Sequence, residues 1–189
     1  MHFYPNIEKL VLASASPRRR ELLSSLGLEF EIRVPQIDET PRPGENPRAF
    51  AERLAAEKAA AIHADSDTVV IAADTIVVLG DDILGKPTDE ARAFDMLSSL
   101  SGQTHQVITG TCVKKDKHIE VFSVSTDVFF RVLTDWEIES YIATGCPMDK
   151  AGAYAIQGGA AHMVRSISGS YTNVVGLPLC ELHEVLNSF

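Results

Sequence analysis

The sequence has few cysteines, no long apolar run and no excess of basic residues, and each absence excludes a class of protein. The three cysteines, Cys112, Cys146 and Cys180, are far apart and odd in number. They argue against a disulfide framework and against a zinc site, and they are typical of a reducing compartment. No apolar run approaches the roughly 18 residues that a membrane-spanning helix requires. We therefore expect a protein that does not associate with a membrane.

Location and charge restrict the function further. The N-terminal residues lack the basic region and apolar stretch of a secretory signal peptide, so we expect a cytoplasmic protein. The formal net charge of −9 disfavours broad nucleic-acid binding, which normally needs a basic face, but a small anionic ligand needs only a few local cations. With 189 residues, 45% of them hydrophobic, the chain is expected to form a single domain over 1–189, with room for a small lobe.

Familiar catalytic motifs are absent as well. The sequence contains no P-loop, no nucleophile elbow, no GxGxxG fingerprint and no histidine pair at metal-binding spacing. The six histidines are scattered, so each is expected to be structural or exposed. What remains is a set of cations, carboxylates and hydroxyls without a strong nucleophile. Such a set is typical of metal-assisted attack of water on a phosphate.

Hydrophobic periodicity and turn residues predict strands interleaved with helices. The segment Thr68 to Ala73 is a β-branched apolar run, typical of a strand that is buried on both faces. The turns around Asp81 and Asp116 each predict a hairpin, so we expect an α/β fold with a mixed sheet flanked by helices. The expected strands are 10–13, 28–34, 68–73, 76–79, 104–114 and 119–133.

Capping residues mark the expected helices. Ser16, Asn46 and Thr88 are each placed as N-caps, Pro17 and Pro47 suit a first helical position, and Thr134 begins a capping box. Residues 146–170 are Gly-rich, and we expect a loop there. The expected helices end near residues 26, 62, 100, 145 and 187, the last beginning near 178.

Three consecutive arginines, Arg18, Arg19 and Arg20, fall in the first turn of the helix that follows Ser16. Cations are unfavourable there because the helix dipole is already positive. A bound phosphate reverses the sign, since N–H groups, serine hydroxyls and arginine side chains all favour an anion. The alternative is a solvated basic turn whose arginines point outward.

Lysines and carboxylates supply the other candidates. Lys58 lies within the apolar stripe of its helix, so it either extends past the edge of the core or projects into a cleft. Asp74 follows a buried run directly, which favours a catalytic or metal-binding role at a strand end over a simple turn cap. Asp38 and Glu39, in a Pro-rich loop, are further metal ligands or surface charges. Lys86, between a hairpin and a helix start, reaches either a phosphate or solvent.

Five blocks, spread over essentially the whole chain, form one ordered pattern: Leu12–Arg19, Glu57–Ala59, Ala73–Val77, Asp149–Gly158 and Gly169–Leu179. The last two blocks are long and specific. In these blocks the sequence resembles the Maf family of nucleoside triphosphate pyrophosphatases.

This resemblance implies an elongated Maf/ITPase-like α/β fold of two lobes with a central cleft, assembled as a homodimer. It also implies hydrolysis between the α and β phosphates of a nucleoside triphosphate with a divalent cation, Mg, Mn or Co. By the same resemblance Asp74 is the acid/base and metal-associated carboxylate, assisted at the metal by Glu39. The residues that would hold phosphates, or support those that do, are Arg19, Lys58, Lys86, Ser14 and Ser16.

Substrate choice within the family is implied for Arg18, Thr75 and Gln157. The stretch Tyr154–Gly158 resembles the branch that acts on dTTP and UTP, with modified pyrimidine triphosphates as further candidates. A glutamine amide donates and accepts at once, which matches the edge that uracil and thymine share and that cytosine reverses. Two alternatives stay open: a pyrophosphatase for 7-methyl-GTP, and a non-catalytic nucleotide-binding regulator of cell division.

Overall fold

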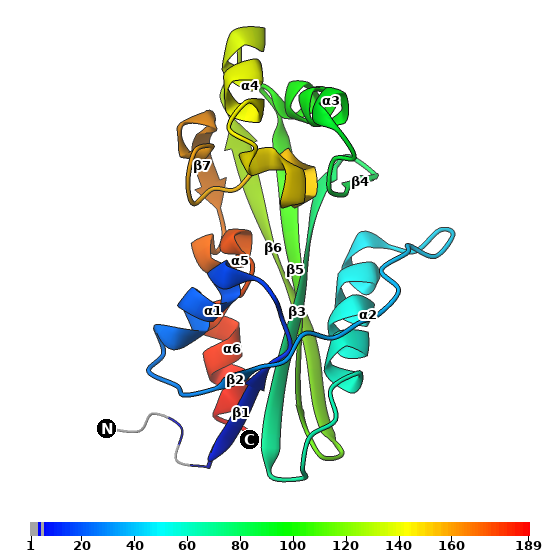
Figure 1. The fold of residues 1–189 in the computed structure, drawn as a ribbon, viewed down its shortest axis with the longest axis vertical. Helices are drawn as coiled ribbons and strands as arrows, with labels where there is room; N and C mark the ends of the chain where they lie inside the picture. Colours follow the sequence, from blue (N-terminus) through cyan, green and yellow to red (C-terminus); the bar gives the residue numbers. More distant parts are fainter. Residues whose placement is uncertain (1–3, 5) are drawn as a thin grey trace. The chain divides into compact units, whose positions relative to one another are not determined.

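One mixed sheet organises the computed structural model, which describes residue 4 and residues 6–189 (Figure 1). Within these residues the sheet has seven strands in the order β2-β1-β3-β5-β6-β7, with β4 paired to β3. β1 runs parallel to β2 and β3, whereas β4 and β7 are antiparallel to β3 and β6, so the prediction of a mixed α/β sheet is confirmed. The strands are β1 Lys9–Leu12, β2 Glu31–Ile32, β3 Thr68–Leu79, β4 Asp82–Leu84, β5 Thr104–Lys115, β6 His118–Phe130 and β7 Val164–Ser168.

Most helices begin where the sequence predicts. Asn46 accepts a hydrogen bond from the Arg48 amide, and Thr134 and Glu137 form the predicted capping box. The α-helices are α1 Pro17–Ser24, α2 Pro47–Ala60, α3 Glu90–Leu100, α4 Asp135–Ile142, α5 Tyr171–Val175 and α6 Leu179–Leu186. The 3₁₀ helices are η1 Cys146–Asp149, η2 Ala151–Ala153 and η3 Ala161–Met163.

Several sequence predictions are wrong in detail. The N-cap of α3 is Asp89 rather than Thr88, because Asp89 Oδ1 accepts from the Arg92 amide at 2.7 Å while the Thr88 hydroxyl only contacts Asp89. The region 146–170 is not all loop, since Val164–Ser168 pairs with β6 and short 3₁₀ turns precede it. The strand expected over 28–34 is reduced to Glu31–Ile32.

The described chain divides into two compact units. Unit 1 consists of residues up to Asp74, 109–124 and 176–189, and unit 2 consists of residues 75–108 and 125–175. Strands β3, β5 and β6 contribute residues to both units. A single domain over 1–189 stays a prediction, and each unit is described separately below.

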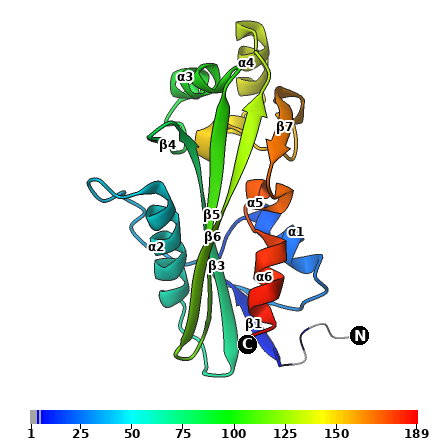
Figure 2. The ribbon, with the colours of Figure 1, turned by 180° about the vertical axis from the view of Figure 1, so that it is seen from behind.

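In unit 1 the alternation of strand side chains creates two apolar layers. Leu12 and Ile71 face a cluster that includes Leu23 of α1 and Leu182 of α6, whereas their neighbours on the strands face α2. Figures 1 and 2 show α2 on one side of β1 and β3, and α1 and α6 on the other. The residues packed on the α2 side are Val11, Ala13, Ala55, Ala59, Ile62, Val70, Ala72 and Cys112.

Unit 2 has its own core, in which α3 and α4 pack together beside the strands. A buried polar pair lies within this core: His105 Nε2 and the Tyr154 hydroxyl are 2.7 Å apart, and both rings meet Phe130 edge-on. The other ring nitrogen of His105 has no hydrogen-bond partner. A neutral imidazole therefore suits this site far better than a charged one.

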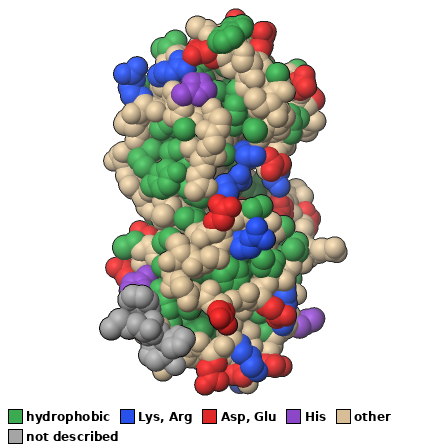
Figure 3. All heavy atoms as spheres, turned by 60° about the vertical axis from the view of Figure 1, so that its left-hand side comes forward, with side chains coloured by type: hydrophobic (Ala, Val, Ile, Leu, Met, Phe, Trp, Pro, Cys, Tyr) green, Lys and Arg blue, Asp and Glu red, His purple; other side chains and the backbone are tan. Residues whose placement is uncertain are grey.

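The distribution of charge on the surface and the character of the helices agree with the acidic composition and with the lack of long apolar runs. Acidic and basic side chains are interspersed over the face in Figure 3, without a continuous basic area on that face. Among the described residues, no helix is both long enough and apolar enough to cross a membrane.

The buried His105 predicts acid sensitivity of the fold. Burial lowers the pKa of His105 from 6.5 to about 4, so the unfolded chain takes up its proton first as the pH falls. The free energy of unfolding should therefore drop by about 3 kcal/mol between pH 6.5 and 4, whereas this loss is absent above pH 6.5. His105→Gln should flatten that dependence in urea denaturation at a series of pH values. His162→Gln, at an exposed position, is the control, and equal slopes for His105→Gln and wild type would contradict the assignment.

Candidate functional site

The sequence predicted Asp74 at the end of a strand, and this prediction is wrong. Asp74 lies inside the continuous strand β3. β3 runs from Thr68 to Leu79, because the apolar segment after Asp74 continues the same extended backbone. Side chains alternate along a strand, so Asp74 shares the α2 side of the sheet with Val70 and Ala72. The only charged residue of the buried run is thereby directed at α2.

Lys58 of α2 meets Asp74 on that side. Its Nζ donates to Asp74 Oδ1 at 2.6 Å and forms an ion pair with Glu39 Oε1 at 2.7 Å. The Lys58 and Asp74 side chains are only 11% and 12% exposed. Lys58 therefore points into the site and does not extend past the core edge to solvent. Asp74 Oδ1 and Glu39 Oε1 therefore lie close together, because both contact the same nitrogen atom.

The adjacent carboxylates Asp38 and Glu39 have different positions. Asp38 Oδ1 accepts hydrogen bonds from the Thr40 amide and hydroxyl, at 2.9 and 2.6 Å, so Asp38 closes a local turn. Glu39, with a 51% exposed side chain, reaches Lys58. Of the two candidates, the structure brings only Glu39 to Asp74 and Lys58.

Arg19 is the arginine of the cluster that faces the site. Its Nε donates to the Gly176 carbonyl at 2.8 Å, and its Nη1 donates to Ser14 Oγ at 3.3 Å. Desolvation lowers the pKa of Arg19, and the negative charges of Asp74 and Glu39 oppose that shift, so Arg19 lies within electrostatic range of both carboxylates.

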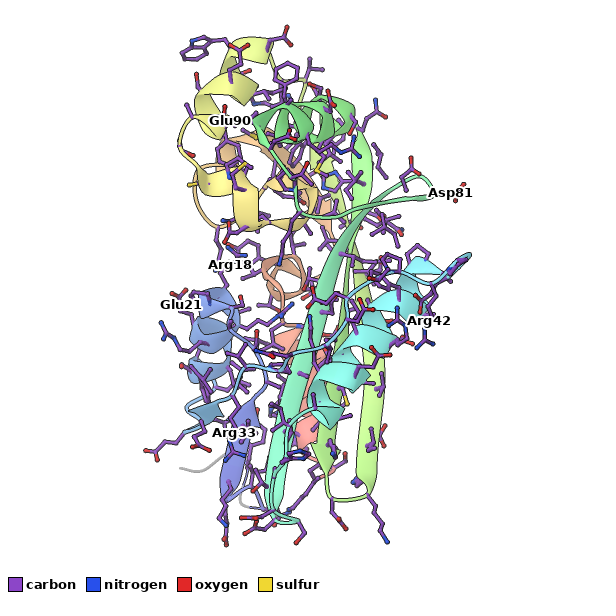
Figure 4. All side chains as sticks on the ribbon, turned by 45° about the vertical axis from the view of Figure 1, so that its right-hand side comes forward. Arg18, Glu21, Arg33, Arg42, Asp81 and Glu90 are labelled. Carbon is purple, nitrogen blue, oxygen red and sulfur yellow. The ribbon has the colours of Figure 1, made fainter. Side chains whose placement is uncertain are left out.

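The other residues of this turn separate around the helix. Ser16 occupies the N-cap position, where its amide donates to Ser14 Oγ at 3.2 Å, but its own hydroxyl makes no capping bond. Arg20 is exposed and Arg18 is half-buried, and Figure 4 shows Arg18 at the N-terminal end of α1. Arg20 therefore points into solvent, as one of the two predictions for the arginine cluster had it, whereas Arg19 does not.

A divalent cation fits the donors of this site in part. Among the described residues there is no cluster of three or more His, Cys, Asp or Glu side chains suited to a metal ion. Asp74 and Glu39 do, however, converge on one point, the ammonium of Lys58. Mg²⁺ is commonly bound by one or two carboxylates, with phosphate oxygens and waters completing its shell. The pair is therefore compatible with a metal that a phosphate ligand helps to hold.

The remaining predicted residues belong to unit 2. Thr75 follows Asp74 on β3 and is half-buried, whereas Lys86 and Gln157 are exposed. The segments before Lys86 and Gln157 are joined, since the Gly152 amide donates to the Gly85 carbonyl at 3.0 Å.

The sequence reasoning missed Gly152. Its φ is +65°, and a Cβ there would come within 3.0 Å of the Val77 side chain. The available signal was its place in the Asp149–Gly158 block, inside the Gly-rich region for which the sequence predicted a loop and no particular turn.

Comparison with known proteins gives consistent matches. A family model described as Maf-like protein matches residues 9–189. A dTTP/UTP pyrophosphatase of Geobacter sulfurreducens is 57% identical over 181 residues, covering 94% of this chain and 95% of that protein. A dTTP/UTP pyrophosphatase of Yersinia pestis is 52% identical over 182 residues, covering 95% and 92%. These matches confirm the family resemblance that the motifs carry.

A solved structure supports the fold. A HAM1 protein from Coxiella burnetii is similar with a TM-score of 0.50 at 17% identity, over 96% of this chain and 99% of that one. At this identity the likeness concerns the fold alone, and it agrees with the observed mixed sheet.

The Lys58–Asp74 pair should stabilise the fold. Lys58→Met keeps the apolar stem but leaves the Asp74 carboxylate nearly buried without its ammonium, so the free energy of unfolding should fall by about 2–4 kcal/mol. Glu39→Gln should cost less than about 1 kcal/mol, because the Glu39 carboxylate is half-exposed and Lys58 keeps Asp74 as its partner. Urea denaturation at pH 7 measures both changes. Equal stability of Lys58→Met and wild type would show that Asp74 does not depend on Lys58.

Proposed function

We propose that this chain, which belongs to the Maf-like protein family, hydrolyses dTTP and UTP to the nucleoside monophosphate and pyrophosphate. The observation that carries the proposal is the placement of Lys58 against Asp74 and Glu39, with Arg19 in electrostatic range. The named activity of relatives that are 52–57% identical over nearly the whole chain supports the same substrate class.

The reaction breaks one P–O bond of the α–β anhydride and adds water across it. The water oxygen attacks phosphorus, its proton passes to a base, and pyrophosphate leaves with the bridging oxygen. Asp74 is the base in this proposal, because it is a carboxylate directed at a polar site from a rigid strand. Lys58, bonded to Asp74 Oδ1, holds the carboxylate in one orientation.

Cations neutralise the phosphates. Arg19 is held by its hydrogen bonds to Ser14 and Gly176, and Lys58 is held by the carboxylates. Both cations are therefore positioned before a ligand arrives. Lys86 is exposed, and its neighbour Gly85 accepts a hydrogen bond from the Gly152 amide. Its binding to a phosphate is part of the proposal and rests on the family resemblance. We also propose that Arg18 and Thr75 help to discriminate between substrates, and that Ser16 supports the turn before α1.

A divalent cation, Mg, Mn or Co, would be held by Asp74 and Glu39 together with substrate phosphates. When bound, it would polarise the phosphate and offset its negative charge. The family resemblance also supports two further proposals, a cytoplasmic location and a homodimer.

Replacing Asp74 by Asn should lower kcat for dTTP and UTP by at least about 10²-fold while the protein stays folded, because the amide retains the shape but not the basicity. Pyrophosphate release is the measurement, and thermal unfolding verifies the fold. Asp81→Asn, in the exposed β3–β4 turn labelled in Figure 4, is the matched control. A wild-type rate in Asp74→Asn would overturn the proposed base.

Gln157 should govern the choice of base more than the rate of hydrolysis. A polar group left unpaired when water is excluded costs ~1–3 kcal/mol. If the bound base covers Gln157, Gln157→Ala should therefore narrow the kcat/KM gap between UTP or dTTP and CTP by roughly 10- to 100-fold. Steady-state kinetics on the three nucleotides tests this, with Gln103→Ala, an exposed glutamine of the same unit, as control. An equal loss on all three substrates would mean that Gln157 shapes its turn and does not read the base.

A further inference from the structure

Arg53 of α2 makes several hydrogen bonds to the loop that carries Glu39. Arg53 Nε and Nη2 donate to Glu45 Oε1 and Oε2 at 2.6 and 2.7 Å, a parallel two-bond pairing. Nη2 also donates, at 3.2 Å, to the carbonyl oxygen of Thr40, the residue directly after Glu39. Arg53 therefore holds the loop both next to Glu39 and just before α2 begins.

Arg53 is itself fixed on the helix. Its Nη1 donates to the two carboxylate oxygens of Glu57, one turn further along α2, at 3.2 and 3.1 Å. Its guanidinium carbon lies 5.4 Å from the centre of the Phe50 ring. The Arg53 and Glu45 side chains are only 13% and 11% exposed. A lysine at this position would keep the charge but could not make these separate bonds at once.

Arg42 adds one contact within the loop and one to α2. The Arg42 amide donates to Glu45 Oε2 at 3.0 Å, and the Arg42 guanidinium donates to Glu57 at 3.2 Å. Figure 4 shows Arg42 beside the N-terminal part of α2. The Arg53 guanidinium holds the pKa of Glu45 at about 2, so this pairing persists at neutral pH.

Arg53 and Lys58 thus hold neighbouring points of the loop from one rigid helix. Arg53 binds the backbone of Thr40, and Lys58 binds the side chain of Glu39. Glu39 has a half-exposed side chain in an irregular segment, where ordering a residue costs conformational entropy. The contacts at Thr40 remove much of that freedom before Glu39 meets its partner.

We propose that Arg53 is a positioning residue, which fixes the loop over residues 38–45 so that the Glu39 carboxylate lies at Lys58 and Asp74. This inference rests on the proposed function for its consequence in catalysis, but the loop geometry can be tested without it.

The test uses the full-length protein with Arg53→Lys, alone and combined with Glu39→Gln. Arg48→Lys is the matched control, since Arg48 lies on the same helix but is exposed and contacts Ser123 instead. If Arg53 acts through Glu39, Arg53→Lys should lower kcat for dTTP by about 10- to 100-fold in the wild-type background. In the Glu39→Gln background it should lower kcat less than about twofold. Equal factors in both backgrounds would overturn the proposal.

Hydrogen–deuterium exchange supplies a second measurement that does not depend on activity. Arg53→Lys should raise exchange across residues 38–45 at least about tenfold over wild type, while Arg48→Lys leaves it unchanged. Glu45→Gln, which weakens the same pairing and keeps Arg53, should raise it in the same direction. Unchanged exchange in both variants would overturn the proposal even if kcat falls. If the wild type hydrolyses no nucleotide, the proposed function fails, and the exchange result still decides the role of Arg53.

Discussion

The ion pair between Lys58 and Asp74 is the interaction on which the candidate site depends. A carboxylate in the middle of a buried strand is unfavourable unless a partner compensates its charge. α2 supplies that partner, because its alanine-rich side packs closely on β1 and β3 and brings Lys58 Nζ to 2.6 Å from Asp74. The position of α2 on the sheet and the position of the site are therefore fixed by the same packing. Glu39 joins the pair from a loop that the same helix holds.

Local rules predicted much of the fold. The β-branched run at 68–73, the helix beginning after Asn46 and the capping box at Thr134 follow from propensity and capping, and each is observed. The continuation of β3 through Asp74 was missed, because a charge after an apolar run looks like a strand end. β7 was missed because none of its residues is buried and its pairing with β6 is not local.

Side-chain partners were harder to predict than elements. Residue patterns alone left Lys58 between two orientations and did not separate Asp38 from Glu39, since packing decides which neighbour each one meets. The family resemblance was what favoured Glu39 and gave Lys58 a role at the phosphates. In the structure the Thr40 amide and hydroxyl donate to Asp38, so Asp38 is bound within its own loop and Glu39 is the carboxylate that contacts Lys58. Consecutive arginines on a helix point about 100° apart, so only some of them can face one ligand. Arg19 faces inward, and Arg20 does not.

Charge balance bears on the proposal that two carboxylates belong to a site for a polyanion. Lys58 and Arg19 bring two positive charges, and Asp74 and Glu39 bring two negative ones, so these four side chains together are formally neutral. A nucleoside triphosphate carries several negative charges, and the whole protein already carries a formal −9. Binding such a ligand with these four groups alone would leave its charge largely uncompensated. A divalent cation bound by the carboxylates would offset their negative charge and would itself bind phosphate oxygens. This is the physical reason why the proposed function includes a metal ion.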